Sequence, residues 1–387
     1  MRLLFVHEVD YLHKPVFEMY EFPENLALMG HEVAFLDFTE ESAPSSAGFD
    51  TAKFVQPRVS PGAKVRIFHQ IPFTAGISGR LIGALTSFRS LRRAIHLSRP
   101  DIVVTYAVPT MGWQAALICR VLRIPLVYRA IDVSHLIRKT PLSFLVKLSE
   151  AFLCRAASHV SANNAALLQY CESLAKRSID GTVDFPPLAI EVFRPETQYS
   201  AALRPASIVY MGSFFYFSGL DRLLMHFAKL EDEGTTLTLI GGGEQDAYLR
   251  SIVEDMGLQK RVTFRGFIDF SELPQEFSKH RVAINPMLSS DVSNLAFPNK
   301  VIQYMASGLP VVTTKLSGLV GTFGTCAPLA WTSSPEETLE VAMELVRDIA
   351  RCDQMSQDSF ELLASRFDST IAVTKFENML DRVGNAT

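Results

Sequence analysis

Lys300 and Gln303, three positions apart, are the residues whose types and spacing best fit a binding site. Apolar residues at helical spacing surround them, so both side chains should lie on one face of a helix. Pro298 fits the first turn of that helix and Gly308 fits its end, after which a short buried strand is expected. A lysine beside the free N–H groups of a helix start binds anions, and phosphate is the usual occupant. A surface lysine and an exposed helical glutamine are the alternatives.

Two glycine-rich turns follow predicted strands in the same half of the chain. Gly212-Ser213 ends one strand, and Gly241-Gly242-Gly243 ends the next. Because parallel strands end at one edge of a sheet, both turns should lie at the same ligand-binding edge. Glycine lets the backbone approach a ligand closely, although tight turns need glycine in any case. We expect Gly212, Ser213, Gly242 and Gly243 to line the site.

Carboxylates in the first half of the chain are candidates for proton transfer. Asp132 follows a predicted strand at 125–129, and Glu8 follows the first strand at 2–7. Both should lie at the carboxyl edge of the first sheet, where an α/β sheet opens toward its ligand. A general base must lie within reach of the hydroxyl that it deprotonates. The alternatives are a helix N-cap for Asp132 and a structural turn for Glu8.

Strands and helices alternate along both halves, which predicts an α/β fold with two parallel, doubly wound, Rossmann-like sheets. The length of 387 residues suits two domains. The first is expected at 1–190 and the second at 207–365, with a linker between them.

Composition excludes several classes of protein. Apolar residues make up 48% of the chain and charged residues 20%, as in ordinary globular proteins. No uninterrupted apolar run approaches the roughly 20 residues of a membrane span. The five cysteines are odd in number and include no CxxC pair, which favours reduced thiols, no zinc site and a cytoplasmic location. No Asp-x-Asp triplet occurs, so a metal-dependent mechanism is not expected. No cofactor is predicted.

Charge is distributed unevenly along the chain. Residues 1–185 contain 20 Lys+Arg and 16 Asp+Glu, whereas 186–387 contain 17 and 25. The segment 51–100 has nine basic side chains and no acidic one, which favours an anionic partner. Its basic amphipathic helix, 78–98, is expected to pack on the sheet through Leu81, Ile82, Leu85, Phe88, Leu91 and Ile95. We assign four residues to a surface that faces the acceptor or an anionic membrane, namely Tyr11, Arg89, Arg92 and Arg93. A basic face that merely meets water is the alternative.

The stretch 294–314 resembles the sugar-nucleotide segment of GT-B glycosyltransferases of the family 1/4-like group. Members often read Pro-x-Lys-x-x-Glu-Tyr-Met-Ala-x-Gly-x-Pro-Val-Val, and the matching residues here are Pro298, Lys300, Gln303, Tyr304, Met305, Ala306, Gly308, Pro310, Val311 and Val312. Many retaining members carry two glutamates with seven residues between them, whereas this chain has Leu295 and Gln303 there. A lysine followed three later by glutamine resembles the xanthan-type glucuronosyltransferase branch instead.

The resemblance implies a GT-B fold, with two Rossmann-like domains facing across a cleft and a last helix, 366–387, returning to the first domain. It implies a donor site formed by the glycine turns together with Phe267, Ile268, Asn299, Lys300 and Gln303. In the family, Phe267 and Ile268 match the segment that holds the nucleobase, and Asp132 resembles the base of the xanthan-type enzyme, with Glu8 as the alternative base. The usual Arg/Lys diphosphate clamp is replaced by aromatic residues and serines at 213–219.

The resemblance implies a function, transfer of a sugar from a UDP-linked nucleotide donor to a lipid-linked or glycan acceptor. The expected partners are that donor, that acceptor and an anionic membrane surface contacted peripherally, with no nucleic acid. Two alternatives stay open, a GT-B-shaped sugar-nucleotide epimerase and a non-catalytic partner of a glycosyltransferase. The sequence does not indicate whether transfer inverts or retains the anomeric configuration.

Overall fold

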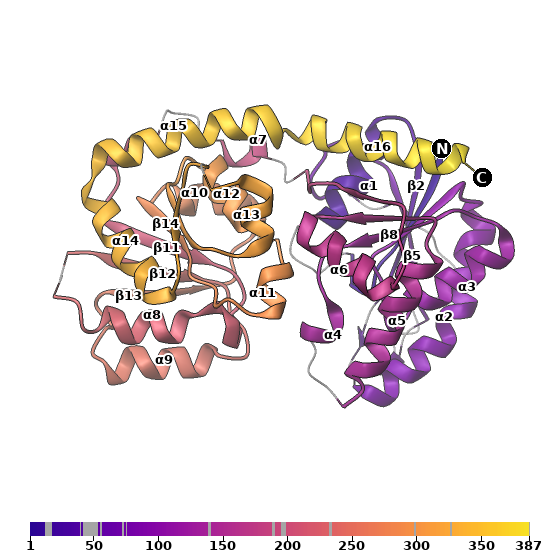
Figure 1. Cartoon of the computed structure of the whole chain (residues 1–387), viewed down its shortest axis with the longest axis horizontal. Coiled ribbons are helices and arrows are strands. Elements are labelled where there is room, and N and C mark those ends of the chain that lie inside the picture. The colour runs from indigo at the N-terminus through magenta and orange to yellow at the C-terminus, as the bar shows by residue number, and fades with distance from the viewer. Residues whose placement is uncertain are drawn as a thin grey trace. The chain divides into compact units, whose positions relative to one another are not determined.

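A computed structural model describes residues 1–11, 18–38, 40–41, 53–54, 56–71, 73–74, 76–137, 141–187, 190–194, 199–231, 234–297, 299–325 and 327–386. The chain forms two compact units, Met1–Pro187 with Thr370–Thr387, and Leu188–Ser369 (Figure 1). The final helix, expected at 366–387, is α16 (Ser369–Asn385), and it groups with the first unit.

The first unit contains an eight-stranded sheet in the order β10-β9-β8-β7-β1-β2-β5-β4. Its strands are β1 (Arg2–Val6), β2 (Glu32–Asp37), β4 (Lys53–Phe54), β5 (Val65–His69), β7 (Ile102–Thr105), β8 (Leu126–Ala130), β9 (His159–Ala162) and β10 (Gly181–Val183). All neighbours pair in parallel except β4 with β5. A separate pair joins β3 (Glu40–Glu41) to β6 (Phe73–Thr74). The predicted parallel sheet is thus confirmed.

Helices cover both faces of this sheet. They are α1 (Glu18–Leu28), α2 (Ile77–Ser98), α3 (Gly112–Leu122), α4 (Ser134–Ile137), α5 (Ser143–Ala156), α6 (Ala165–Ala175) and α16. Buried side chains of α1 and α16 form one core with alternate residues of the strands, and the Phe22 and Phe376 rings stack at 4.1 Å. Packing of the two rings removes their apolar surface from water, which holds the C-terminal helix against the first unit.

Helix α2 packs through a different face from the one predicted. Leu91 and Ile95 are buried, but Leu81, Ile82 and Leu85 are exposed. The residues that face the protein in its first turns are small, Gly79, Gly83 and Ser87 among them. Small side chains let a helix backbone approach its neighbour closely. The prediction was wrong for the first half of α2, because it assumed that the largest apolar residues turn inward.

The second unit contains a parallel six-stranded sheet in the order β13-β12-β11-β14-β15-β16. Its strands are β11 (Ser207–Met211), β12 (Thr236–Ile240), β13 (Val262–Gly266), β14 (Val282–Asn285), β15 (Val311–Thr314) and β16 (Leu329–Thr332). Its α-helices are α7 (Ile190–Phe193), α8 (Leu220–Phe227), α9 (Asp246–Asp255), α10 (Leu273–Phe277), α11 (Asp291–Leu295), α12 (Lys300–Ala306), α13 (Ser317–Phe323), α14 (Pro335–Arg347) and α15 (Ile349–Arg366), with 3₁₀ turns at Ala201–Leu203, Tyr216–Ser218 and Phe270–Glu272. The first strand, β11, lies between the second and the fourth, which is the Rossmann order with its switch point between β11 and β14.

None of the described helices is both long and apolar enough to cross a bilayer.

Candidate active site

The glycine turns of the second unit lie together at the carboxyl edge of its sheet. The Gly212 N–H donates to the Ile240 carbonyl at 2.9 Å, and the Phe214 N–H donates to the Gly242 carbonyl at 2.9 Å. The Gly241 N–H donates to the Gly266 carbonyl at 2.8 Å, which adds the turn after β13. The two glycine turns expected at one edge therefore lie together there, joined by the turn after β13, and Ser213 and Gly243 are exposed.

Gly241 is the position where this cluster of turns requires glycine. Its φ is +120°, and a Cβ there would lie 2.1 Å from the Gly212 carbonyl oxygen. Other residue types avoid this backbone region, and the backbone oxygen cannot rotate away.

We expect Gly241→Ala to destabilise the protein by about 2–4 kcal/mol, since steric overlap adds to the unfavourable φ. Urea unfolding measures this change. Gly321→Ala is the matched control, because Gly321 lies within α13 and a Cβ there meets no described atom within 4 Å. That variant should be unchanged or slightly more stable. Equal stability of the two variants would contradict the close approach of these turns.

Lys300 extends from α12 toward the end of β11, at the switch point of the sheet. Its Nζ lies 4.2 Å from the centre of the Tyr210 ring, and a Cβ at Gly212 would lie 2.8 Å from the same atom. No described carboxylate forms an ion pair with it. Removal of the amine from water lowers its pKa from 10.5 to about 7. The Lys300 amine can therefore gain or lose its proton near pH 7, and it lies beside backbone that glycine leaves open.

Neighbouring residues of α12 fix the position of this lysine. Tyr304 is fully buried, and its hydroxyl accepts a hydrogen bond from the Met211 N–H at 2.5 Å, which ties α12 to the end of β11. Gln303 is only 7% exposed, so the alternative of an exposed helical glutamine is wrong. The buried Asn299 Oδ1 has no hydrogen-bond partner in the described part of the chain. Pro298, expected in the first turn, lies outside the described residues. Because α12 has only seven residues and therefore a small dipole, we attribute the positive charge of the site to Lys300.

The turn after β13 carries Phe267 and Ile268. Phe267 is 78% exposed, and its ring stands beside Gly242, with Cε2 3.1 Å from the place of a Cβ there. An exposed aromatic ring at the rim of a glycine cluster suits stacking against a planar ligand. Ile268 is half-buried in the same turn.

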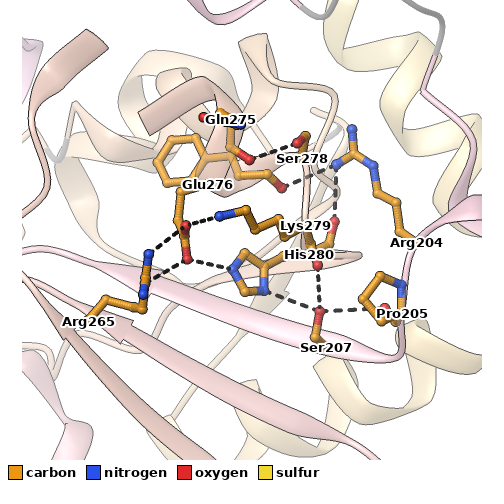
Figure 2. A network of polar contacts seen from close by, with 10 residues as sticks. Arg204, Pro205, Ser207, Arg265, Gln275, Glu276, Ser278, Lys279 and His280 are labelled. Carbon is orange, nitrogen blue, oxygen red and sulfur yellow. Dashed lines mark hydrogen bonds and ion pairs between the residues drawn. The ribbon is translucent and has the colours of Figure 1, made fainter. Parts of the chain in front are cut away.

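Figure 2 shows a polar network that anchors the base of this turn, which sequence reasoning missed. The Glu276 carboxylate accepts hydrogen bonds from Arg265 Nε at 3.1 Å and Lys279 Nζ at 2.6 Å. Burial opposes ionisation of Glu276, but the Lys279 hydrogen bond and the Arg265 charge outweigh it and lower its pKa. Burial lowers the pKa of His280 to about 4, so its ring is neutral where its Nδ1 lies 3.2 Å from the Ser207 hydroxyl. The network joins both ends of the β11–β13 segment to α10.

The first unit has a pocket of about 240 Å³ at its own switch point, between β1 and β7. The turns after β1, β7 and β8 line it, with contributions from α4. The lining residues are His7, Glu8, Val9, Tyr106, Ala107, Val108, Pro109, Ile131, Asp132, Ser134 and Ile137. The structure therefore brings the two candidate proton acceptors into one pocket. His7 lies there too, with its ring stacked on Tyr106 at 4.9 Å.

The two carboxylates of this pocket differ in their contacts. Glu8 Oε1 accepts hydrogen bonds from the N–H groups of Val108, Thr110 and Met111, at 3.1, 2.6 and 3.1 Å. These bonds hold the carboxylate against the turn that leads into α3, as a cap would. Asp132 Oδ1 accepts a weaker bond from the Ser134 hydroxyl at 3.4 Å. Asp132 is half-buried in the wall of the pocket.

A buried carboxylate behind the pocket positions the Asp132 turn. Glu150 of α5 accepts a hydrogen bond from the Ser134 N–H at 2.8 Å and contacts His135 Nδ1 at 2.5 Å. Burial raises the pKa of Glu150 to about 8, and burial likewise lowers the pKa of His135. Both shifts favour the uncharged forms of the two groups.

The surface assignment of Tyr11 was wrong. Its side chain is fully buried, packs edge-on against Tyr20 and Phe35 at 4.7 Å each, and donates to Glu24 at 3.3 Å. A tyrosine with one hydrogen-bond partner can occupy a core, which the polar neighbours of Tyr11 in the sequence did not suggest. Arg89 and Arg92 are exposed as expected, and Arg93 is half-buried.

Two Rossmann-like units in one chain are the architecture of the GT-B fold. Two family models match the chain: "Glycosyl transferase 4-like domain" over residues 19–178 and "Glycosyl transferases group 1" over residues 205–348. The chain thus consists of a domain similar to each, in the order that GT-B glycosyltransferases have. The group 1 model covers the glycine turns and Lys300, and the 4-like model covers Asp132.

Solved structures support the same fold. HepE from Anabaena, in complex with UDP and glucose, superposes with a TM-score of 0.76 at 16% identity over 99% of this chain and 100% of that one. Sucrose-phosphate synthase from Thermosynechococcus elongatus gives a TM-score of 0.76 at 16% identity, with full coverage of both chains.

Two curated proteins align over part of their length. The 2-deoxystreptamine glucosyltransferase of Streptomyces kanamyceticus is 26% identical over 142 residues, which is 36% of this chain and 35% of that protein. An uncharacterized glycosyltransferase of Methanocaldococcus jannaschii is 26% identical over 114 residues, or 29% of this chain and 28% of that protein. The alignments thus span about a third of these relatives. None of these four proteins is named as a xanthan-type glucuronosyltransferase.

Proposed function

We propose that the protein is a glycosyltransferase that moves a sugar from a UDP-sugar to a hydroxyl of a lipid-linked or glycan acceptor. The observation that carries this proposal is the Lys300 amine at the switch point of the second unit, beside the interlocked glycine turns. A site of this kind suits a diphosphate, since it offers one cation and backbone that a ligand can approach closely. The UDP-bound HepE structure supports uridine as the nucleoside.

Each unit would supply one part of the reaction. In the second unit, Lys300 would neutralise charge on the leaving diphosphate, the Gly212 and Gly242 turns would hold it, and Phe267 would contact the base. In the first unit, Asp132 would accept the proton of the acceptor hydroxyl as that oxygen attacks the anomeric carbon. We favour Asp132 over Glu8 because three backbone N–H groups already bind one Glu8 oxygen. A base at Asp132 implies transfer with inversion.

The test begins with a thermal-shift screen of nucleotide sugars. A donor present at 100 times its Kd should stabilise the protein by about 2.7 kcal/mol through mass action. We expect UDP-sugars to stabilise it more than GDP- or ADP-sugars. The stabilising donor is then incubated with lipid-linked and glycan acceptors, and UDP release and the anomeric configuration of the product are measured.

The outcomes separate the candidate functions. Acceptor-dependent UDP release with a glycosylated product supports the proposal. Conversion of the donor to an epimer would assign an epimerase, and donor binding without turnover across the acceptor panel would assign a non-catalytic partner. Absence of any nucleotide-dependent stabilisation would refute the donor site itself.

A further inference from the structure

The exposed stripe of α2 is apolar in its first half and basic in its second. Leu81, Ile82 and Leu85 are exposed, and Leu85 reaches 73%. Farther along the same face, Arg89, Arg92 and His96 are exposed in turn. Small residues occupy the packed side of the helix. Among them, the buried Ser87 hydroxyl donates a hydrogen bond to the Ala84 carbonyl at 2.7 Å. The helix therefore presents its leucines outward, where water contact costs free energy.

The start of α5 presents a second set of apolar side chains. Phe144 is 61% exposed, Leu148 is 62% exposed, and Leu145 lies between them on the same first turns. Lys147 is exposed beside them. A single exposed leucine is ordinary on a protein surface, but clusters on two helices in one unit point to a partner.

Helix α3 contacts both of the helices that carry these two sets. The Gln114 side chain of α3 donates to the Ala84 carbonyl of α2 at 3.0 Å. On its other side, Gly112 lies so close to α5 that a Cβ there would be 2.8 Å from Leu153 Cδ1. The first turn of α3 thus contacts both helices. We call the exposed residues Leu81, Ile82, Leu85, Arg89, Arg92, Phe144, Leu145, Lys147 and Leu148 the α2–α5 surface.

The charge of this surface has one sign. Helices α2, α3 and α5 carry seven Lys+Arg, and their one carboxylate, Glu150, is buried. No exposed carboxylate therefore competes for a ligand on these three described helices. Exposed arginines alone would also suit a nucleic acid. Exposed aliphatic side chains and a phenylalanine beside these cations instead suit the headgroup and acyl boundary of a bilayer.

We propose that the α2–α5 surface docks the protein on an anionic phospholipid bilayer. The leucines and Phe144 enter the boundary between headgroups and acyl chains, while the arginines and Lys147 contact the phosphates. The inference rests on the proposed function in one respect, since a lipid-linked acceptor would be met at such a surface. It adds the exposed apolar residues of α2 and the α5 residues to Arg89 and Arg92, which the sequence already placed on such a surface.

Vesicle co-sedimentation tests the docking surface with the full-length protein. Vesicles of phosphatidylcholine alone are compared with vesicles that also contain phosphatidylglycerol, at low and high salt. We expect binding to the anionic vesicles that weakens with salt and little binding to the neutral ones. The double variant Leu85→Asp/Leu148→Asp should lower the partition coefficient at least about tenfold, because each leucine loses its buried apolar area. Arg89→Gln/Arg92→Gln should lower it about tenfold or more.

Matched controls lie in the second unit. Leu203 is 87% exposed, so Leu203→Asp removes an exposed leucine from elsewhere, and Lys260→Gln removes an exposed cation. Both controls should bind vesicles as the wild type does. Donor binding in the thermal-shift assay should be unchanged in all variants, which separates failure of docking from failure of the donor site. Equal binding to neutral vesicles, equal loss in the controls, or binding to RNA in place of vesicles would each overturn the proposal.

Discussion

Lys300→Ala should lower kcat/KM for transfer from the nucleotide donor by about 10²–10³-fold, the usual loss when one group that stabilises developing charge is removed. The effect should be large because no described carboxylate pairs with the amine, which lies over the Tyr210 ring near the open backbone of Gly212. A screened surface lysine would instead contribute little. Initial rates at subsaturating donor measure the change. Lys260→Ala, at an exposed lysine in the same unit, should leave the rates unchanged.

The pH dependence of donor binding tests the same lysine without turnover. Its pKa of about 7 in the free protein means that the site loses its positive charge as the pH rises above 7. A bound diphosphate raises that pKa again, so binding takes up a proton. Donor affinity should therefore fall with rising pH above 7, by up to about tenfold per pH unit. Calorimetry in two buffers with different ionisation enthalpies counts the proton.

Two results would contradict this assignment. One is unchanged transfer by Lys300→Ala while the protein keeps its fold. The other is a donor affinity that is constant from pH 7 to pH 9. Lys300→Arg serves as the charge-preserving variant, because arginine stays protonated over this range. It should lose the pH dependence while keeping measurable affinity.

The stability of the free protein follows from the same shift. The folded-state pKa of Lys300 lies below its ordinary value of 10.5, so the unfolded chain binds more protons between pH 7 and 10.5. This term makes the folded state more stable as the pH rises through that window, and it is a penalty at pH 7. A desolvated lysine that costs stability is typical of a ligand site, where the ligand compensates for the missing partner.

The alternation of strands and helices predicted both sheets, because short apolar runs flanked by turn residues indicate buried strands. It also placed the turns after β11, β12 and β8 at the edges where the structure has them. Local spacing could not predict partners distant in the chain. Arg129 is fully buried, and Glu18, 111 residues away, compensates for its burial by accepting two of its hydrogen bonds at 2.7 and 2.9 Å. The network around Glu276 was missed for the same reason.

The sequence also could not predict which face of α2 packs against the protein. Periodicity locates the apolar face of α2 but cannot tell whether that face meets the protein or a partner outside it. The small residues Gly79 and Gly83, at a spacing of four, were the signal that a different face of α2 could pack closely against the protein. Exposed leucines become informative only when the packed face is known, so the apolar part of the docking surface emerged from the structure.

Asp132→Asn should reduce transfer by about 10²–10⁴-fold while leaving donor binding intact, since general-base catalysis contributes that much. The substitution keeps the size of the side chain and the hydrogen bond that its oxygen accepts from Ser134. Donor affinity should persist because the donor residues lie in the other unit. The loss should therefore appear in kcat and not in the donor KM, as is typical when a group acts in the transition state. Rates at saturating donor, with calorimetry for binding, check both parts.

Glu8→Gln and Glu150→Gln are the comparison variants for Asp132. Glu8 binds three backbone N–H groups, so Glu8→Gln should chiefly destabilise the first unit and lower the midpoint of urea unfolding. Glu150 orients the Ser134 backbone and His135, so Glu150→Gln should lower kcat through a displaced Asp132 turn, with a smaller loss than Asp132→Asn. If Glu8→Gln abolished transfer in a fully folded protein while Asp132→Asn retained it, the base would be Glu8 and the assignment of Asp132 would be wrong. The anomeric configuration of the product adds an independent check, because a base at Asp132 requires inversion, and a retained configuration would exclude this role for either carboxylate.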